Sequence, residues 1–262
     1  MSLFELINKR VQKPDNRVRD LYVDALVRII TNTIYEDPSS APWHEGRGFG
    51  PHERDQGMDW PQKAHTMVGV KRLRNLATLT QKVIDDDIPG DFIETGVWRG
   101  GCCILMRGIL AANNRHDRKV YVADSFEGLP VPTEGVEADK GDEHHTFMQL
   151  QVTQEEVAAN FERYGLLDET VVFLKGWFKD TLPALEPRAR FALLRLDGDM
   201  YESTMDGLSA LYPKLSRGGY VIIDDYGCVP GCKQAVHDYR QNHGINDEIV
   251  TIDWTGVYWR KS

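Results

Sequence analysis

Five short apolar segments in the second half of the chain alternate with helical or turn-rich segments, and this alternation constrains the fold more than any other feature. The segments are DFIETG from Asp91, KVYVADS from Lys119, TVVFLKG from Thr170, FALLRLDGD from Phe191 and GYVIIDD from Gly219. Each is rich in β-branched or aromatic residues and shows no polar alternation, which is typical of strands covered on both faces. We therefore predict an α/β fold with a mostly parallel sheet.

The C-terminal segment predicts a different connection. DEIVTIDWTGVYWRK, beginning at Asp247, is typical of two strands separated by a few residues. Such a hairpin adds an antiparallel strand to a sheet that is parallel until then. This ending is similar to class I methyltransferases, whereas a nicotinamide-binding Rossmann domain usually continues with parallel strands. We expect the Rossmann-like fold of class I S-adenosylmethionine-dependent methyltransferases, with a helical lid at the N-terminus.

The N-terminal third predicts helices and a long loop. Apolar residues from Val18 to Ile30 recur at spacings of three, four and seven, the pattern of an amphipathic helix. Residues 35–61 are rich in Gly, Pro, His and charge, which is typical of a long loop. The segment VGVKRLRNLATLTQKVIDDD then predicts a further helix before the first strand.

These patterns divide the chain into two regions. Residues 1–88 are expected to form an N-terminal helical lid region, and residues 89–262 the S-adenosylmethionine-binding domain. That domain carries a polar inserted loop at about 126–150, a length at which loops tend to be functional. In the helix that follows the insertion, Thr153 and Glu156 predict a capping box.

Composition argues against several classes of function. The 262 residues carry a formal net charge of −9, which argues against a nucleic-acid partner, because that binding depends on Lys and Arg clusters. No signal-peptide-like segment and no run of about 18 apolar residues occurs, so we expect a soluble, cytoplasmic protein with no membrane partner. The cysteines show no disulfide framework. Cys228 and Cys232 could offer two zinc ligands, but small buried residues are the ordinary interpretation.

A glycine-rich turn follows the first predicted strand in FIETGVWRGG. Glu94 and Gly96 lie at the strand end, and glycines there let a ligand approach the backbone closely. The spacing is not G-x-G-x-x-G, because Val97 and Trp98 occupy positions where a pyrophosphate needs room. The turn therefore fits a ligand without a pyrophosphate, such as S-adenosylmethionine, whose amino group would pair with Glu94.

Residues at the ends of the second and third strands extend this prediction. Asp124 occupies the position where an acid accepts the hydroxyls of an adenosine ribose, although a turn or helix-cap role is equally typical of it. Trp177 and Phe178 could flank an adenine ring, and core packing at a strand–helix junction is the alternative.

Four carboxylates follow the fourth and fifth strands: Asp197, Asp199, Asp224 and Asp225. The carboxyl ends of neighbouring strands meet at one edge of the ligand crevice, where these charges would repel one another. Mg²⁺ prefers carboxylate oxygens and would relieve that repulsion. We assign Asp197, Asp224 and Asp225 to the metal and Asp199 to proton acceptance. Helix capping is the competing interpretation, above all for Asp199.

The motifs taken together resemble the macrocin O-methyltransferase family. HTMVGVKRLRNL, FIETGVWRGG, VYVADSFEGLP, LKGWFKDTLP, LRLDGDMYEST and GGYVIIDDYG occur in family order over most of the chain. The resemblance implies metal-dependent methylation of a deoxysugar hydroxyl on a glycosylated antibiotic intermediate, for which we expect the 4-hydroxyl of noviose in novobiocin biosynthesis. It also implies a homodimer.

The resemblance further implies a set of site residues. Mg²⁺ would be bound by Asp197, Asp224 and Asp225, with Asp199 as the base. His65, Thr66, Met67 and Val68 would lie in a lid over the cofactor. The remaining cofactor-binding residues are expected to be Glu94, Gly96, Asp124, Ser125, Gly176, Trp177 and Phe178.

Three other functions compete with this prediction. A glycosyltransferase would use the Asp-x-Asp pattern of DGD, but it leaves ETGVWRGG and Asp224 and Asp225 without a role. A catechol-type methyltransferase would differ only in its acceptor, and a non-enzymatic regulator would bind metal or nucleotide without turnover. His144 and His145 are a rival base, although paired histidines in a polar loop are typically exposed.

Overall fold

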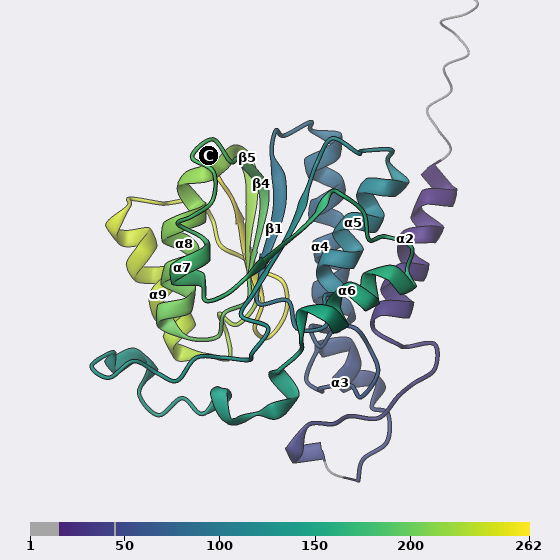
Figure 1. Ribbon diagram of the computed structural model, residues 1–262, viewed down its shortest axis with the longest axis horizontal. Coiled ribbons are helices and arrows are strands. Elements are labelled where there is room, and N and C mark those ends of the chain that lie inside the picture. The colour runs from purple at the N-terminus through teal and green to yellow at the C-terminus, as the bar shows by residue number, and fades with distance from the viewer. Residues whose placement is uncertain (1–15, 45) are drawn as a thin grey trace, which may run out of the picture.

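A seven-stranded sheet forms the centre of the molecule (Figure 1). The computed structural model describes residues 16–44 and 46–262, and the strand order is β3-β2-β1-β4-β5-β7-β6. The strands are β1 (Asp91–Thr95), β2 (Val120–Asp124), β3 (Val171–Lys175), β4 (Phe191–Leu196), β5 (Leu215–Ile223), β6 (Val250–Thr251) and β7 (Val257–Arg260). β1 to β5 pair in parallel, whereas β7 pairs antiparallel with β5 and with β6. All five predicted strands and the terminal hairpin are thereby confirmed.

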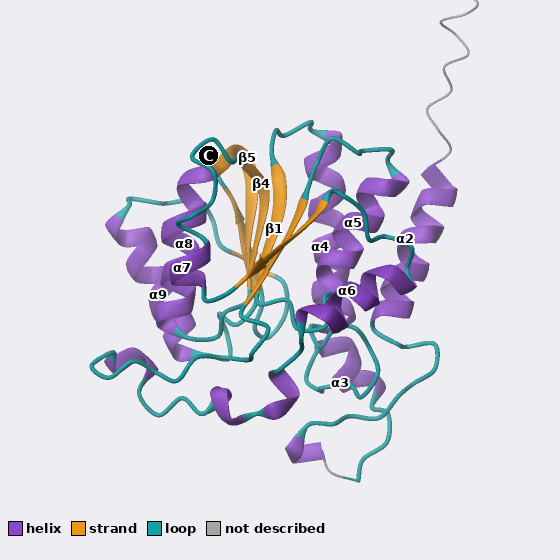
Figure 2. Ribbon diagram, viewed as in Figure 1, coloured by secondary structure: helices purple, strands orange, loops and turns teal. Residues whose placement is uncertain are grey.

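Helices cover both faces of the sheet (Figure 2). One side carries α2 (Asn16–Ile30), α4 (Gly69–Asp85), α5 (Gly101–Ala112) and α6 (Gln154–Arg163), and the other carries α7 (Phe178–Thr181), α8 (Tyr201–Leu211) and α9 (Pro230–Asn242). The short helix α3 (Pro51–Gln56) lies in the N-terminal loop. One-turn 3₁₀ helices are η1 (Pro42–His44), η2 (Glu137–Asp139), η3 (His144–Thr146), η4 (Met148–Leu150) and η5 (Tyr212–Lys214). No helix among the described residues is long and apolar enough to span a membrane.

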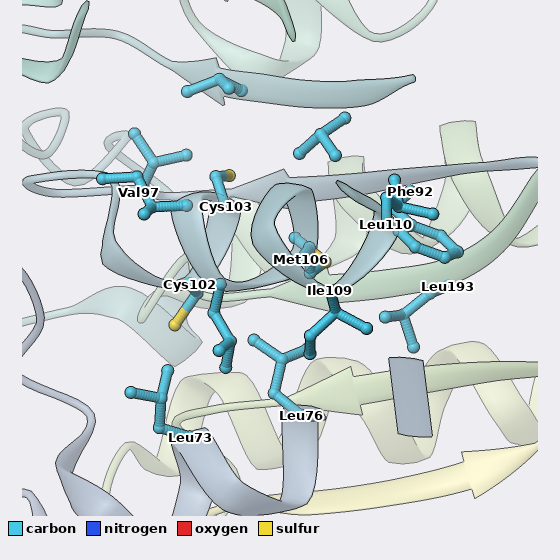
Figure 3. Close-up of a cluster of buried hydrophobic side chains, with 14 of the residues drawn as sticks. Leu73, Leu76, Phe92, Val97, Cys102, Cys103, Met106, Ile109, Leu110 and Leu193 are labelled. Atoms are coloured by element: carbon cyan, nitrogen blue, oxygen red, sulfur yellow. The ribbon is translucent and has the colours of Figure 1, made fainter. Parts of the chain in front are cut away.

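Two hydrophobic cores result from this arrangement. Successive side chains of a strand point to opposite faces, so Leu193 of β4 packs with α4 and α5, whereas Leu194 packs with α8 and α9. Burial on both faces explains why the strand segments are apolar throughout. Figure 3 shows part of the first core, with Leu73, Leu76, Phe92, Val97, Cys102, Cys103, Met106, Ile109, Leu110 and Leu193.

The N-terminal helical region packs directly on this first core. Leu26 and Ile30 of α2 are buried in it, which confirms the predicted helix. Part of the apolar surface of α2 is not buried: Val18 is 72% exposed and Leu21 is 69% exposed. The predicted division between residues 88 and 89 falls between α4 and β1 and stays a prediction, and residues 1–15 lie outside the described part.

The inserted loop determines how α8 begins. The carboxylate of Asp139 accepts hydrogen bonds from the backbone N–H groups of Tyr201, at 2.6 Å, and Glu202, at 3.1 Å. These are N–H groups of the first helical turn, which have no partner within the helix. The insertion therefore supplies the cap of α8 across more than sixty positions of sequence. At α6 the cap is local, as predicted, because Thr153 accepts from the N–H of Glu156.

We expect Asp139→Ala to lower the free energy of unfolding by about 1 to 2 kcal/mol, because two N–H groups at a helix N-terminus lose their acceptor. Urea denaturation followed by circular dichroism measures the change. Glu137→Ala is the matched control, since Glu137 forms only an exposed pair with Lys140. Equal stabilities of the two variants would contradict the capping role.

Candidate active site

A cavity of about 550 Å³ opens at the carboxyl ends of the parallel strands. Its walls come from the ends of β1, β2, β4 and β5, from the start of α4, from both long loops and from the turn of the terminal hairpin. The inserted loop 126–150 and α3 lie at this same end of the sheet (Figure 1). Ligands of open α/β sheets bind at this edge, because the strand order reverses there and leaves a crevice.

Two glycines bring the turn after β1 close to its neighbours. Gly96 has a φ of +76°, and an added Cβ would overlap the carbonyl oxygen of Asp197. At Gly101, the first residue of α5, an added Cβ would lie 2.4 Å from the carbonyl oxygen of His65, to which Gly101 donates its N–H. Only glycine allows both approaches, so the predicted glycine turn fixes how β1, β4 and the segment before α4 meet.

Asp124 combines the two roles that the sequence left open. Its carboxylate accepts the backbone N–H of Val97 at 2.8 Å and that of Phe126 at 2.7 Å, which makes it a turn acid. The same side chain lines the cavity, together with Ser125, and Asp124 lies beside the glycine turn. Ser125 Oγ, at 3.4 Å, and the N–H of Trp98 also contact this carboxylate, so a ligand hydroxyl would share the acceptor with them or displace the weaker contacts.

Most other predicted cofactor residues line the cavity, but two do not. Thr66, Met67, Val68, Glu94, Gly96, Trp177 and Phe178 line it. His65 instead places Nδ1 2.7 Å from the hydroxyl of Tyr164, and Gly176 lies outside the cavity wall. The structure thus brings His65 to the edge of the lid segment and away from the cavity.

The four predicted carboxylates meet at the cavity. Oxygens of Asp197, Asp199 and Asp225 lie within 4.8 Å of one another, a group that could hold a metal ion. Asp199 has a φ of +53°, and its backbone N–H donates to Asp225 at 3.1 Å. Asp199 does not cap α8, since Asp139 does. Helix capping, the competing interpretation of Asp199, is therefore wrong.

Asp224 faces two arginines. One of its oxygens accepts from Arg72 and the other from Arg195, and all three side chains are buried. Arg72 also donates to Asp253 at 3.1 Å and to the carbonyl of Gly57 at 3.1 Å. Reasoning from the sequence missed both arginines. The available signal was Arg195 itself, a single charge within the apolar run FALLRL.

Carboxyl groups outnumber guanidinium groups at this end of the sheet. Five carboxylates line the cavity, those of Glu94, Asp197, Asp199, Asp224 and Asp225. Arg72 pairs with Asp224, and Arg195 pairs with Glu94, Asp197 and Asp224, whereas no ion pair to Asp199 or Asp225 occurs among the described residues. Burial and repulsion from Asp224 raise the pKa of Asp197 to about 8, although Arg195 opposes the shift. Burial also raises the pKa of Asp199 to about 6. Such an assembly fits a divalent cation, which would stabilise the ionised forms.

Aromatic side chains from the two long loops pack together at the cavity. Trp43 and Trp60 have ring centroids 4.8 Å apart, and Phe147 lies 5.3 Å from Trp60. We call these three residues the aromatic wall; both tryptophans line the cavity. His144 lines it as well and places Nδ1 2.7 Å from Asp142, so it is not the freely exposed residue that its polar loop predicted.

The strand order, with its antiparallel end, and the cavity at the carboxyl ends of the parallel strands are those of a class I methyltransferase fold. The chain belongs to the macrocin O-methyltransferase family, whose model, described as macrocin-O-methyltransferase (TylF), matches residues 19–261. This membership confirms the predicted family and supports S-adenosylmethionine-dependent methylation over the glycosyltransferase alternative.

Two relatives and one solved structure illustrate the family. The demethyldecarbamoylnovobiocin O-methyltransferase of Streptomyces niveus is 50% identical over 254 residues, covering 95% of this chain and 97% of the relative. The mycinamicin III 3''-O-methyltransferase of Micromonospora griseorubida is 50% identical over 248 residues, covering 93% and 97%. The structure of the O-methyltransferase NovP superposes with a TM-score of 0.88 at 51% identity, covering 93% of this chain and 99% of NovP. The class I fold is thereby confirmed.

His65 should make stability depend on pH. Burial, with the nearby charges of Arg163 and Arg99, lowers the pKa of His65 from 6.5 to about 4. Below about pH 6.5 the unfolded chain takes up a proton that the folded state refuses until about pH 4, so stability falls as pH falls through this window.

We expect the free energy of unfolding to drop by roughly 2 kcal/mol more in the wild type than in His65→Gln between pH 7 and pH 5. Urea denaturation at the two pH values measures the difference. His116→Gln, at an exposed position, is the control and should follow the wild type. A wild-type drop no larger than that of His65→Gln would refute the linkage.

Proposed function

We propose that this chain is a Mg²⁺-dependent O-methyltransferase that transfers the methyl group of S-adenosylmethionine to a deoxysugar hydroxyl of a glycosylated antibiotic intermediate. The observation that carries the proposal is the excess of carboxylates at the cavity, next to the glycine turn. Both relatives described above carry antibiotic names in their activities, which supports an acceptor of this class.

The cofactor would lie along the ends of β1 and β2. Glu94 faces the cavity at the end of β1 and would pair with the amino group of S-adenosylmethionine. Asp124 would accept the ribose hydroxyls. Trp177 and Phe178 line the cavity after β3, where they would flank the adenine, and Thr66, Met67 and Val68 would cover the cofactor.

Asp197, Asp224 and Asp225 would hold the cation. A carboxylate oxygen of Asp197 lies within 4.8 Å of a carboxylate oxygen of Asp225. Asp224 would contribute a remaining lone pair, because a carboxylate offers about four acceptor sites and the arginines use only two of them. A bound divalent cation supplies Lewis acidity, which makes a sugar hydroxyl easier to deprotonate.

Asp199 would accept the proton of the acceptor hydroxyl. Its carboxylate lines the cavity and shares the acidic group with Asp197 and Asp225. A cation bound by Asp197, Asp224 and Asp225 would keep Asp199 ionised, the form that can accept a proton. The lid segment and the inserted loop would exclude water and align the hydroxyl with the methyl donor.

The aromatic wall would bind the acceptor. Trp43 is 53% exposed although it lines the cavity, so its ring is available to the apolar face of a deoxysugar or to a flat aglycone. The 4-hydroxyl of noviose is the acceptor that we propose to test first. The two relatives are equally similar to this chain yet are named for different antibiotics, so identity alone does not select between them. A catechol acceptor is the alternative.

Association into a homodimer is a further part of the proposal. The exposed apolar face of α2, with Val18 and Leu21, would lose its contact with water in such a dimer. A nucleic-acid partner would not suit the net charge of −9.

Incubation with labelled S-adenosylmethionine, Mg²⁺ and an acceptor panel tests the function. The panel contains demethyldecarbamoylnovobiocin, mycinamicin III and simple catechols. We expect label transfer to a glycosylated antibiotic, its loss in excess EDTA and its recovery on adding Mg²⁺. Full activity in EDTA would reject the cation, and transfer to catechols alone would reject the sugar acceptor.

We expect Asp199→Asn to lower kcat by roughly 100-fold or more, because an amide cannot accept the hydroxyl proton. Binding of S-adenosylhomocysteine, measured by calorimetry, should stay at the wild-type level. Asp180→Asn, at an exposed acid outside the cavity, is the matched control. A normal kcat in Asp199→Asn would exclude this residue as the base.

We expect Trp43→Ala to raise the KM of the acceptor by roughly 3- to 10-fold with a smaller effect on kcat, because a stacking surface is lost. Steady-state kinetics with the best acceptor of the panel measure both constants. Tyr35→Ala, at an aromatic residue that is 85% exposed and outside the cavity, is the control. An unchanged KM in Trp43→Ala would rule out the aromatic wall as an acceptor surface.

A further inference from the structure

Arg195 is a charged residue at a position where the fold otherwise requires an apolar one. It lies in β4, all six residues of which are buried, and its own side chain is 2% exposed. A buried guanidinium is tolerated only where carboxylates surround it, because its desolvation costs more than a single ion pair returns. Arg195 meets this condition, since it contacts Glu94, Asp197 and Asp224.

The strand register explains why these groups meet. Glu94 of β1 is the register partner of Arg195 in β4, so both side chains project from the same face of the sheet. Asp197 follows two positions after Arg195 and extends that row. Arg195 donates to Glu94 at 2.6 Å and to Asp197 at 2.9 Å.

Arg195 is the one cationic side chain that forms an ion pair with Glu94 among the described residues. Glu94 is only 1% exposed, and burial raises its pKa while Arg195 opposes the shift. Its second oxygen accepts the S–H of Cys103 at 2.9 Å, and Cys102 also donates to this carboxylate, but thiols are weak donors. Glu94 lines the cavity, whereas Arg195 lies behind it and does not. Arg195 could therefore influence a ligand of Glu94 only through Glu94, because Arg195 itself does not reach the cavity.

We propose that Arg195 is a positioning residue for the cofactor, because it holds Glu94 as an oriented anion toward the amino group of S-adenosylmethionine. This inference rests on the proposed function, which assigns Glu94 to that amino group. Its role is distinct from that of Arg72, which contacts Asp224, Asp253 and Gly57.

A pair of ligands isolates the effect. S-adenosylhomocysteine carries the amino group, whereas 5'-methylthioadenosine has the same adenosine and thioether but lacks the amino-acid part. We expect Arg195→Met to lower the preference for S-adenosylhomocysteine over 5'-methylthioadenosine by roughly tenfold or more, the size expected for a lost charged hydrogen bond. Titration calorimetry of the full chain measures both affinities. A purely structural role would weaken both ligands alike and leave this ratio unchanged.

Three variants complete the test. Arg195→Lys keeps the positive charge but loses the forked pair of donors. It should therefore lower the affinity ratio of S-adenosylhomocysteine to 5'-methylthioadenosine less than Arg195→Met does. It replaces Arg195→Met in the test if that variant does not fold. Arg72→Met removes the other buried arginine of the cluster and should leave the ratio unchanged. Glu94→Gln should lower the ratio as Arg195→Met does.

The outcomes separate this inference from the function on which it rests. A wild-type ratio in the folded Arg195 variants, together with a lowered ratio in Glu94→Gln, overturns the role of Arg195 alone. A wild-type ratio in Glu94→Gln overturns the assignment of Glu94 to the amino group, and with it this inference. A ratio lowered equally by Arg72→Met would also overturn it, because the effect would then belong to the whole cluster.

Discussion

The concentration of buried carboxylates around two arginines is the constraint on which the functional end of the molecule depends. Like charges in a low-dielectric site repel strongly, and removing them from water adds a further cost. Arg195 and Arg72 neutralise part of this charge, and Asp224 is shared between them. The remaining carboxylates are those that the proposed cation would neutralise. Folding is more favourable with fewer buried carboxylates at this site, whereas the proposed cation site needs several of them.

Much of the surrounding structure serves to hold these side chains in place. Gly96 lets the turn after β1 approach the backbone at Asp197, which no residue with a Cβ could do. Asp139 caps α8 from the inserted loop, so Asp199 faces the cavity instead of capping the helix that follows it. The strained φ of Asp199 is typical of functional positions that the surrounding structure enforces.

The division of labour within the chain follows from this arrangement. The sheet edge supplies the charged groups, which the short connections after β1, β4 and β5 hold rigidly. The two long loops supply the aromatic wall, which is the surface that we propose for the acceptor. Loops tolerate substitution better than strand ends. Relatives with half of their residues identical can therefore share one chemistry and be named for different acceptors.

The sequence by itself determined the five parallel strands, the terminal hairpin and the meeting of Asp197, Asp199 and Asp225. These follow from local periodicity and from the rule that the carboxyl ends of neighbouring strands meet. Only the tertiary structure decided that Asp139 caps α8, that Arg72 reaches Asp224 and that Trp43, Trp60 and Phe147 form one wall. Such contacts join segments far apart in the chain, and their geometry depends on loop paths and side-chain packing that no local pattern encodes.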